Sequence, residues 1–236
     1  MLTVVTWKWK PTRGYRSEFG PETVNTLAKM VARHYKHPHR VVCVTDDPVG
    51  IDPSIGIVPL WNDLSQLTNP HGAHQPSCYR RLKAFSTEAR EWFGDRFVSV
   101  DLDCVIVGDM APLWNRPEEF VIWGSGTDKR VWCNGSMWMM TTGTRSKVWD
   151  TFNPKRSPNE AKAAGFFGSD QGWIAHCLGR KEAMWTMRDG VYSFRVHLNG
   201  GSKQLPDDAR IVFFHGKHDP WSAHCQAIPW IAESYN

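Results

Sequence analysis

Short apolar runs of strand length alternate with segments of helical periodicity along this chain. Residues 2–9 predict a first strand. Gly20-Pro21 then opens a segment whose apolar residues recur at helical spacing, with proline at the favoured first position. Residues 40–45 and 56–60 predict two more short strands. Because parallel strands need crossover connections that are usually helical, this alternation predicts an α/β fold: a mixed, mostly parallel central sheet with flanking helices.

The rest of the chain continues the pattern. Its 236 residues, 41% of them hydrophobic, suit one large domain with a proper core. No repeat, low-complexity tract or linker divides the sequence, so we expect a single domain over residues 1–236. Further helices are expected at about 77–92 and 168–178, and further strands at 97–100, 105–107, 120–123, 135–141 and 209–214.

Net charge and cysteine usage restrict the possible ligands and the cellular compartment only broadly. Lys and Arg number 28 against 24 Asp and Glu, a net charge of +4 that fits anionic small ligands as well as nucleic acid. The six cysteines occur singly, without a Cys-x-x-Cys pair, which favours reduced thiols and no zinc. Neither a signal peptide nor an apolar run of membrane-spanning length is found, so we expect a cytoplasmic protein without a transmembrane segment.

Asp101-Leu102-Asp103 is the strongest candidate for a functional site. A bare Asp-x-Asp arises by chance in about half of chains this long. This one directly follows the apolar run 97–100, and ligands bind at the carboxyl ends of strands in open α/β sheets. On extended backbone, two side chains at spacing two project to the same face, so both carboxylates could converge on one hard cation. A metal site is the first hypothesis.

A second apolar run, residues 211–214, leads into His215-Gly216-Lys217. An imidazole could complete a metal site begun by two carboxylates, glycine permits close backbone approach to a diphosphate, and lysine supplies a compact positive charge. Mixed carboxylate and imidazole ligation favours Mn²⁺, with Mg²⁺ as the second choice. The alternatives are a satisfied histidine at a strand end and a solvated turn at residues 217–219.

Further short motifs stand in a fixed order around these two elements: Tyr79-Arg80-Arg81-Leu82, then the Asp-x-Asp, then Asn134-Gly135-Ser136, Asp170-Gln171, and finally His215-Gly216 with Pro220-Trp221. In this order the motifs resemble those of the nucleotide-sugar glycosyltransferases of the GT-A fold, in particular glycosyltransferase family 8, which includes glycogenin and bacterial lipopolysaccharide galactosyltransferases. The likeness runs from about residue 79 onward.

The resemblance implies a Rossmann-like GT-A fold, with a nucleotide-binding half at about residues 1–110 and a sugar and acceptor half at about 111–236. It implies a metal ion held by Asp101, Asp103 and His215, and transfer with retention of the anomeric configuration. The implied catalytic residues are Asp170, Gln171 and Asn134. Asp170 at a helix start is also a good N-cap, which is the structural alternative.

The implied donor is a nucleoside diphosphate sugar, with UDP-sugar as the expected form. The acceptor is open: a glycan, a lipid-linked glycan, a protein or a modified nucleobase. The implied substrate-binding residues are Thr6, Trp7, Lys8, Tyr79, Arg81, Leu102, Gly135, Ser136, Gly216, Lys217 and Trp221.

Two departures accompany the likeness. The first strand runs through Thr6-Trp7-Lys8, where the family usually has an acidic or polar nucleotide contact. The closing motif is one residue shorter, and Asp219 occupies its lysine position. Three other functions compete: a glycosyltransferase acting on a modified DNA base, a non-catalytic nucleotide-sugar or glycan-binding relative, and a haloacid-dehalogenase-type phosphohydrolase. The last requires threonine where Val105 stands and a motif near the first strand.

Overall fold

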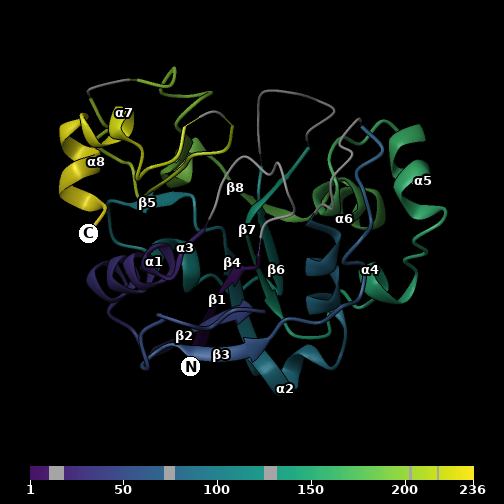
Figure 1. The fold of residues 1–236 in the computed structure, drawn as a ribbon. Helices are drawn as coiled ribbons and strands as arrows, with labels where there is room; N and C mark the ends of the chain where they lie inside the picture. Colours follow the sequence, from purple (N-terminus) through teal and green to yellow (C-terminus); the bar gives the residue numbers. More distant parts are fainter. Residues whose placement is uncertain (11–18, 72–77, 125–131, 202–203, 217) are drawn as a thin grey trace.

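A seven-stranded sheet in the order β3-β2-β1-β4-β7-β6-β8 runs through the middle of the molecule in this computed structural model (Figure 1). The structure describes residues 1–10, 19–71, 78–124, 132–201, 204–216 and 218–236. The strands of this central sheet are β1 (Leu2–Lys8), β2 (His39–Thr45), β3 (Gly56–Pro59), β4 (Arg96–Val100), β6 (Phe120–Trp123), β7 (Asn134–Thr141) and β8 (Ala183–Trp185).

Most neighbours in the central sheet are parallel. The pairs β1/β2, β1/β4, β2/β3 and β6/β8 run parallel, whereas β7 runs antiparallel to both β4 and β6. Because β7 runs the opposite way, its first residues lie at the edge of the sheet where β4 ends. The expected mixed, mostly parallel sheet is therefore confirmed.

A second, three-stranded sheet has the order β5-β10-β9. Here β10 pairs antiparallel with β5, with Phe213 opposite Cys104, and parallel with β9. The end of β10 consequently lies beside the segment that leaves β4. The strands of this sheet are β5 (Cys104–Ile106), β9 (Val191–Ser193) and β10 (Ile211–Phe213).

Helices cover both faces of the central sheet. Figure 1 shows α1 and α8 on one side and α4, α5 and α6 on the other, and the two sides form separate buried clusters. The helical elements are α1 (Pro21–His34), the 3₁₀-helix η1 (Cys78–Phe85), α2 (Ala89–Phe93), α3 (Ala111–Trp114), α4 (Lys147–Asp150), α5 (Ser157–Ala163), α6 (Asp170–Leu178), the 3₁₀-helix η2 (Met187–Asp189), α7 (Ala223–Gln226) and α8 (Pro229–Ser234).

The residues of β7 show how the sheet separates the two buried clusters. Met137 and Met139 join the cluster that contains α1, while Trp138 and Met140 join the cluster on the opposite face. All four side chains are fully buried. Strands buried on both faces carry continuous rather than alternating apolar residues, which is why they were visible in the sequence as short apolar runs.

Two sequence expectations differ from the structure. The helix expected at about 77–92 is two shorter elements, η1 and α2, because the chain turns at Ser86, whose amide donates to the carbonyl of Lys83 at 2.9 Å. The strands β8 and β9 were not expected, since three residues are too few to show a period. None of the helices in the described ranges has the length and apolar character needed to cross a membrane.

A buried valine in the second sheet and an exposed valine elsewhere test how much packing of this sheet contributes to the free energy of unfolding. Val212 in β10 is fully buried, whereas Val49 is 78% exposed. We expect Val212→Ala to lower the free energy of unfolding by about 2 kcal/mol, since it removes buried methyl groups and leaves a cavity. The same change at the control position, Val49→Ala, is expected to alter it by less than about 0.5 kcal/mol. Urea denaturation measures both, and equal effects would contradict the described packing.

Candidate functional site

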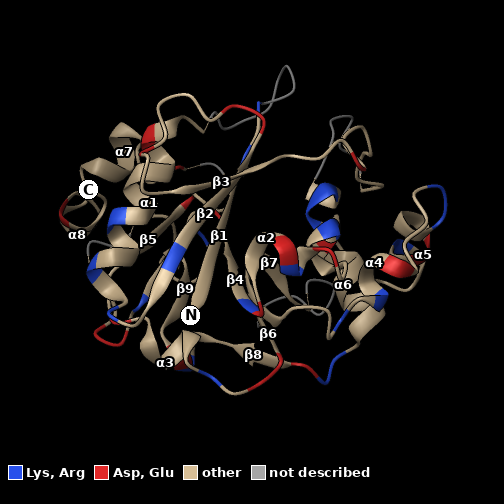
Figure 2. Cartoon of the chain, turned by 90° about the horizontal axis from the view of Figure 1, so that it is seen from below, with Lys and Arg blue, Asp and Glu red and all other residues tan. Residues whose placement is uncertain are grey.

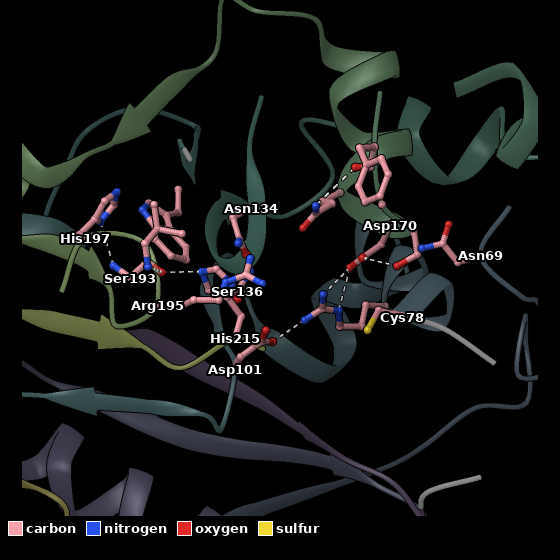
Figure 3. Close-up of a pocket in the computed structure, with 17 residues that line it drawn as sticks. Asn69, Cys78, Asp101, Asn134, Ser136, Asp170, Ser193, Arg195, His197 and His215 are labelled. Carbon is pink, nitrogen blue, oxygen red and sulfur yellow. Dashed lines mark hydrogen bonds and ion pairs between the residues drawn. The ribbon is translucent and has the colours of Figure 1, made fainter. Parts of the chain in front are cut away.

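A cavity of about 530 Å³ opens where β4 ends, β7 begins and α6 starts, and it reaches the loops that follow β9 and β10 (Figure 3). Segments far apart in the sequence therefore share one space. The lining residues are Asn69, Cys78, Arg81, Asp101, Trp123, Asn134, Ser136, Phe167, Gly168, Ser169, Asp170, Gln171, Ser193, Arg195, Val196, His197 and His215.

Two backbone hydrogen bonds bring these segments together. The amide of Asp101 donates to the carbonyl of Ser136 at 2.9 Å, which joins the end of β4 to β7. The amide of Phe214 donates to the carbonyl of Asp103 at 2.7 Å, which joins the same segment to the end of β10. Residues 101–103 are thus a corner where the chain passes from the central sheet into the second sheet. The predicted convergence of residues 101–103 and 214–215 is present in the backbone.

The Asp-x-Asp segment is nevertheless not extended. Strand β4 ends at Val100, β5 begins at Cys104, and the residues between them form a bend. Asp101 lines the cavity, Leu102 belongs to the hydrophobic core, and Asp103 is 9% exposed without lining the cavity. The expectation of extended backbone through Asp101 and Asp103 is therefore wrong, because the chain bends at Leu102 and Asp103, while the shared direction of the two carboxylates stays a prediction.

Arg81 from η1 lies between two carboxylates that also line the cavity, those of Asp101 and Asp170, which Figure 3 labels. One guanidinium nitrogen binds Asp101, and another lies 2.6 Å from Oδ2 of Asp170, which also accepts a 2.8 Å hydrogen bond from Nε. Burial alone would lower the pKa of Arg81, but Asp101 and Asp170 raise it well above its usual value. Burial raises the pKa of Asp101 despite the facing Arg81. Both carboxylates thus lie within ion-pair distance of one buried guanidinium.

Glycine at position 135 allows this cluster to form. A Cβ added there would lie 2.9 Å from Nη2 of Arg81 and 3.3 Å from Oδ2 of Asp170, both tighter than ordinary contacts. The amide of Gly135 also donates to Oε1 of Gln171 at 3.2 Å, and Oδ1 of Asn134 accepts from the amide of Ser136 at 2.9 Å. The predicted Asn-Gly-Ser and Asp-Gln motifs are therefore in direct contact.

Asp170 is the first residue of α6, and the capping position is held by Ser169. The carboxylate of Asp170 is directed to Arg81 rather than to the helix backbone amides. The structural alternative, a role as N-cap alone, does not describe its contacts. Its side chain is only 3% exposed.

His215 lines the same cavity as Arg81. Its Nε2 is 2.8 Å from Oγ of Ser193, and its ring centroid is 5.8 Å from that of Trp123. Asp101 and His215 line the same cavity, and carboxylate plus imidazole is a donor set that suits Mn²⁺. Across the described ranges, however, no three His, Cys, Asp or Glu side chains are grouped so as to hold a metal ion. The donor types fit the predicted ion, and the metal site stays a prediction.

Three residues of β1 that we expected to bind substrate do not line the cavity. Thr6 is fully buried. Trp7 is 6% exposed and donates through Nε1 to Oγ of Ser99 at 2.8 Å. The ammonium of Lys8 donates to the carbonyl of Asp47 at 2.7 Å. Strand β1 is flanked by β2 and β4, and the side chains of these three residues are buried.

Other expected substrate contacts divide between core, surface and cavity. Tyr79 and Leu102 are core residues at 1% and 2% exposure, and neither lines the cavity. Trp221 packs against Phe19 with ring centroids 5.5 Å apart, also away from the cavity lining. Arg81 and Ser136 line the cavity, and Gly135 touches its lining residues. Lys217 lies outside the described residues.

Several cavity residues were not anticipated. Ser193 ends the three-residue strand β9, and Arg195 and His197 follow it; this short strand gave no sequence signal. Burial lowers the pKa of His197, whose Nδ1 accepts from the amide of Ser193 at 2.9 Å, so its ring is neutral at pH 7. Burial raises the pKa of Cys78 to about 12, which keeps this thiol protonated and makes it a poor nucleophile.

No family model and no curated protein matches the sequence. Solved structures do match the fold. A galactosyltransferase, LgtC, in complex with donor and acceptor sugar analogues has 12% identity and a TM-score of 0.61, covering 99% of this chain and 96% of that one. The glycosyltransferase GlyE of Streptococcus pneumoniae TIGR4 has 12% identity and a TM-score of 0.57, covering 94% and 57%. The bifunctional glycosyltransferase WbbM has 11% identity and a TM-score of 0.56, covering 99% and 50%.

At these identities the likeness shows the fold. The chain has the GT-A fold of these glycosyltransferases, as the sequence motifs led us to expect. Because LgtC is matched over almost its whole length, the central sheet, the second sheet and the helices between them all belong to the shared architecture.

The buried charge cluster predicts a stability difference between two ion-paired aspartates. Asp170 is 2.6 Å from Arg81 with 3% of its side chain exposed, while Asp95 is 2.8 Å from Arg90 with 83% exposed. We expect Asp170→Asn to lower the free energy of unfolding by about 3 kcal/mol, because a buried guanidinium loses a charged partner. The matched control Asp95→Asn is expected to cost at most about 1 kcal/mol. Urea denaturation at neutral pH compares the two variants. A loss in free energy of unfolding for Asp170→Asn no larger than for Asp95→Asn would contradict the buried ion pair between Asp170 and Arg81.

Proposed function

We propose that this protein is a glycosyltransferase that transfers a sugar from a nucleoside diphosphate sugar, with a UDP-sugar as the expected donor, to an acceptor not yet identified. One observation carries the proposal. On a fold shared with sugar-transferring enzymes, a single cavity gathers side chains from the predicted motifs, namely Arg81, Asp101, Asn134, Asp170, Gln171 and His215.

The size and polarity of the cavity support a sugar donor. A volume of about 530 Å³ falls within the range of about 300–1,000 Å³ that is usual for small-molecule sites. Its lining combines carboxylates, amides, hydroxyls and guanidinium groups with the apolar faces of Trp123 and Phe167. Such a lining can both accept and donate hydrogen bonds to sugar hydroxyl groups.

The amides and carboxylate at the start of α6 and β7 are held in fixed positions. Oδ1 of Asn134 accepts from the amide of Ser136, which leaves its amide nitrogen as the donor for a ligand. Oε1 of Gln171 accepts from the amide of Gly135, and Asp170 is held by Arg81. We assign these three residues to orienting the transferred sugar, since groups already in place lose little conformational entropy when they bind.

Metal dependence is part of the proposal. Asp101, Asp103 and His215 are the residues that would hold Mn²⁺, with Mg²⁺ as the second choice. When bound, such an ion neutralises charge that develops on the departing diphosphate. Since Arg81 binds Asp101 in this structure, a metal ion would have to compete with Arg81 for that carboxylate. Retention of configuration is carried over from the family resemblance alone.

Of the competing functions, action on a modified DNA base has no support from charge distribution. Figure 2 shows the lysines and arginines of the described residues scattered over separate helices and loops and interspersed with acidic residues. A duplex-binding surface would require them along a continuous stripe.

Nucleotide binding is tested by thermal stability. We expect Mn²⁺ together with UDP or a UDP-sugar to raise the melting temperature, because a ligand that binds only the folded state stabilises it by about 2.7 kcal/mol at a hundredfold excess over its Kd. For a chain of this size that corresponds to roughly 5–10 °C. Differential scanning fluorimetry with UDP, GDP, CDP and ADP provides the comparison. A protein that responds to none of these nucleotides would argue against a transferase.

Donor turnover separates an enzyme from a non-catalytic binder. Glycosyltransferases without acceptor hydrolyse their donor slowly, so we expect this protein to release UDP from its donor sugar. Asp103→Ala is expected to reduce the rate by roughly a hundredfold, since it removes a carboxylate that would hold the metal ion. Asp95→Ala, on the surface, is the control. Chromatographic detection of released UDP measures all three proteins, and tight binding of the donor without any release identifies a binder.

A further inference from the structure

Arg195 is the cavity residue that the sequence motifs give no reason to select. It follows β9, is exposed, and lines the same cavity as Asp101 and His215. In Figure 3 its side chain extends into the space shared with Asn134 and His215. We infer that Arg195 is the cation that binds the diphosphate of the nucleotide ligand, an inference that rests on the proposed function and adds a binding residue to it.

The assignment of Arg195 to the diphosphate rests on the charges of the residues that line the cavity. Arg81 and Arg195 are the lysine or arginine residues among the described lining residues. Arg81 is already bound by Asp101 and Asp170, so this cluster has one positive charge against two negative charges. A site with this cluster alone would repel a diphosphate. Within the described ranges Arg195 makes no ion pair, so its charge is the one left for an anionic ligand.

Gly216 gives Arg195 its position. The guanidinium stem lies against the Gly216 backbone, since a Cβ added there would be 3.1 Å from Cδ and 3.4 Å from Nη1 of Arg195. Gly216 also has a φ of +117°, which side-chain-bearing residues rarely adopt. The glycine that the sequence suggested for close approach to a diphosphate therefore lies directly beneath an arginine side chain.

Hydrogen bonds hold the backbone on both sides of Arg195, on one side to the end of β10 and on the other to the end of β9. The amide of Phe194 donates to the carbonyl of Phe213 at 2.9 Å, and the rings of Phe194 and Phe214 stack 4.4 Å apart at 19°. On the other side, the amide of Val196 donates to Oγ of Ser193 at 3.1 Å. The same hydroxyl contacts His215. Arg195 thus projects from a braced turn, so little backbone ordering is needed when it binds a ligand.

The arginine side chain suits the expected ligand. Its planar guanidinium presents parallel N–H donors that match two phosphate oxygens. In the closing motif of this chain, the family's lysine position is occupied by Asp219, a negative residue. Arg195 supplies a cation from the neighbouring strand end instead, and it does so at the glycine of the same motif.

The test is isothermal titration calorimetry of the full chain, in Mn²⁺ buffer, with UDP, uridine and inorganic pyrophosphate. Arg195→Gln is expected to weaken UDP and pyrophosphate binding roughly tenfold or more, while uridine binding is unchanged. Arg195→Lys should recover part of the affinity, because it restores the charge but not the forked geometry. Arg188→Gln, which removes an exposed arginine outside the cavity, is the matched control and should bind as the wild type does.

The outcomes separate the two proposals. If the wild type binds UDP and Arg195→Gln binds it equally well, this inference is overturned while the proposed function stands. If Arg195→Gln loses uridine and UDP in the same proportion, the side chain maintains the cavity rather than binding phosphate, which also overturns it. If the wild type binds none of the nucleotides UDP, GDP, CDP and ADP and does not bind pyrophosphate, the proposed function fails and the inference fails with it.

Discussion

The corner at residues 101–103 is the constraint on which the site depends. Two backbone hydrogen bonds hold it, one to Ser136 in the central sheet and one from Phe214 beside the second sheet. Backbone bonds of this kind are independent of side-chain identity, so they fix the positions of β4, β7 and β10 at one edge even when the side chains there change. The cavity exists because two sheets with different strand directions are joined at this corner.

The charged cluster of Arg81, Asp101 and Asp170 is the part of the site whose burial costs the most desolvation free energy. Burying Arg81 with Asp101 and Asp170 removes three charges from water, and the loss is recovered only through close pairing. A fold that served stability alone would place apolar side chains there. Polar groups that are fully paired with one another, yet border an open space, are consistent with a surface built to meet a polar ligand.

The sequence predicted this architecture better than its site. Strands such as β4 and β7 were visible because burial on both faces leaves unbroken apolar runs, whereas the motif residues Asn134 and Asp170 were found through the family resemblance. Thr6, Trp7 and Lys8 were expected to bind substrate; they are buried and do not line the cavity, and their role in binding stays a prediction. Arg195 was missed because β9 has only three residues.

Gly135 sets a limit on how this chain can change. Most buried positions in a protein can exchange one side chain for another of similar volume, and folds survive such drift over long periods. A Cβ at position 135 would lie 2.9 Å from Nη2 of Arg81 and 3.3 Å from Oδ2 of Asp170, so any larger residue would have to push the guanidinium and the carboxylate aside. Glycine at position 135 therefore preserves the meeting of these two groups, however far the rest of the sequence diverges.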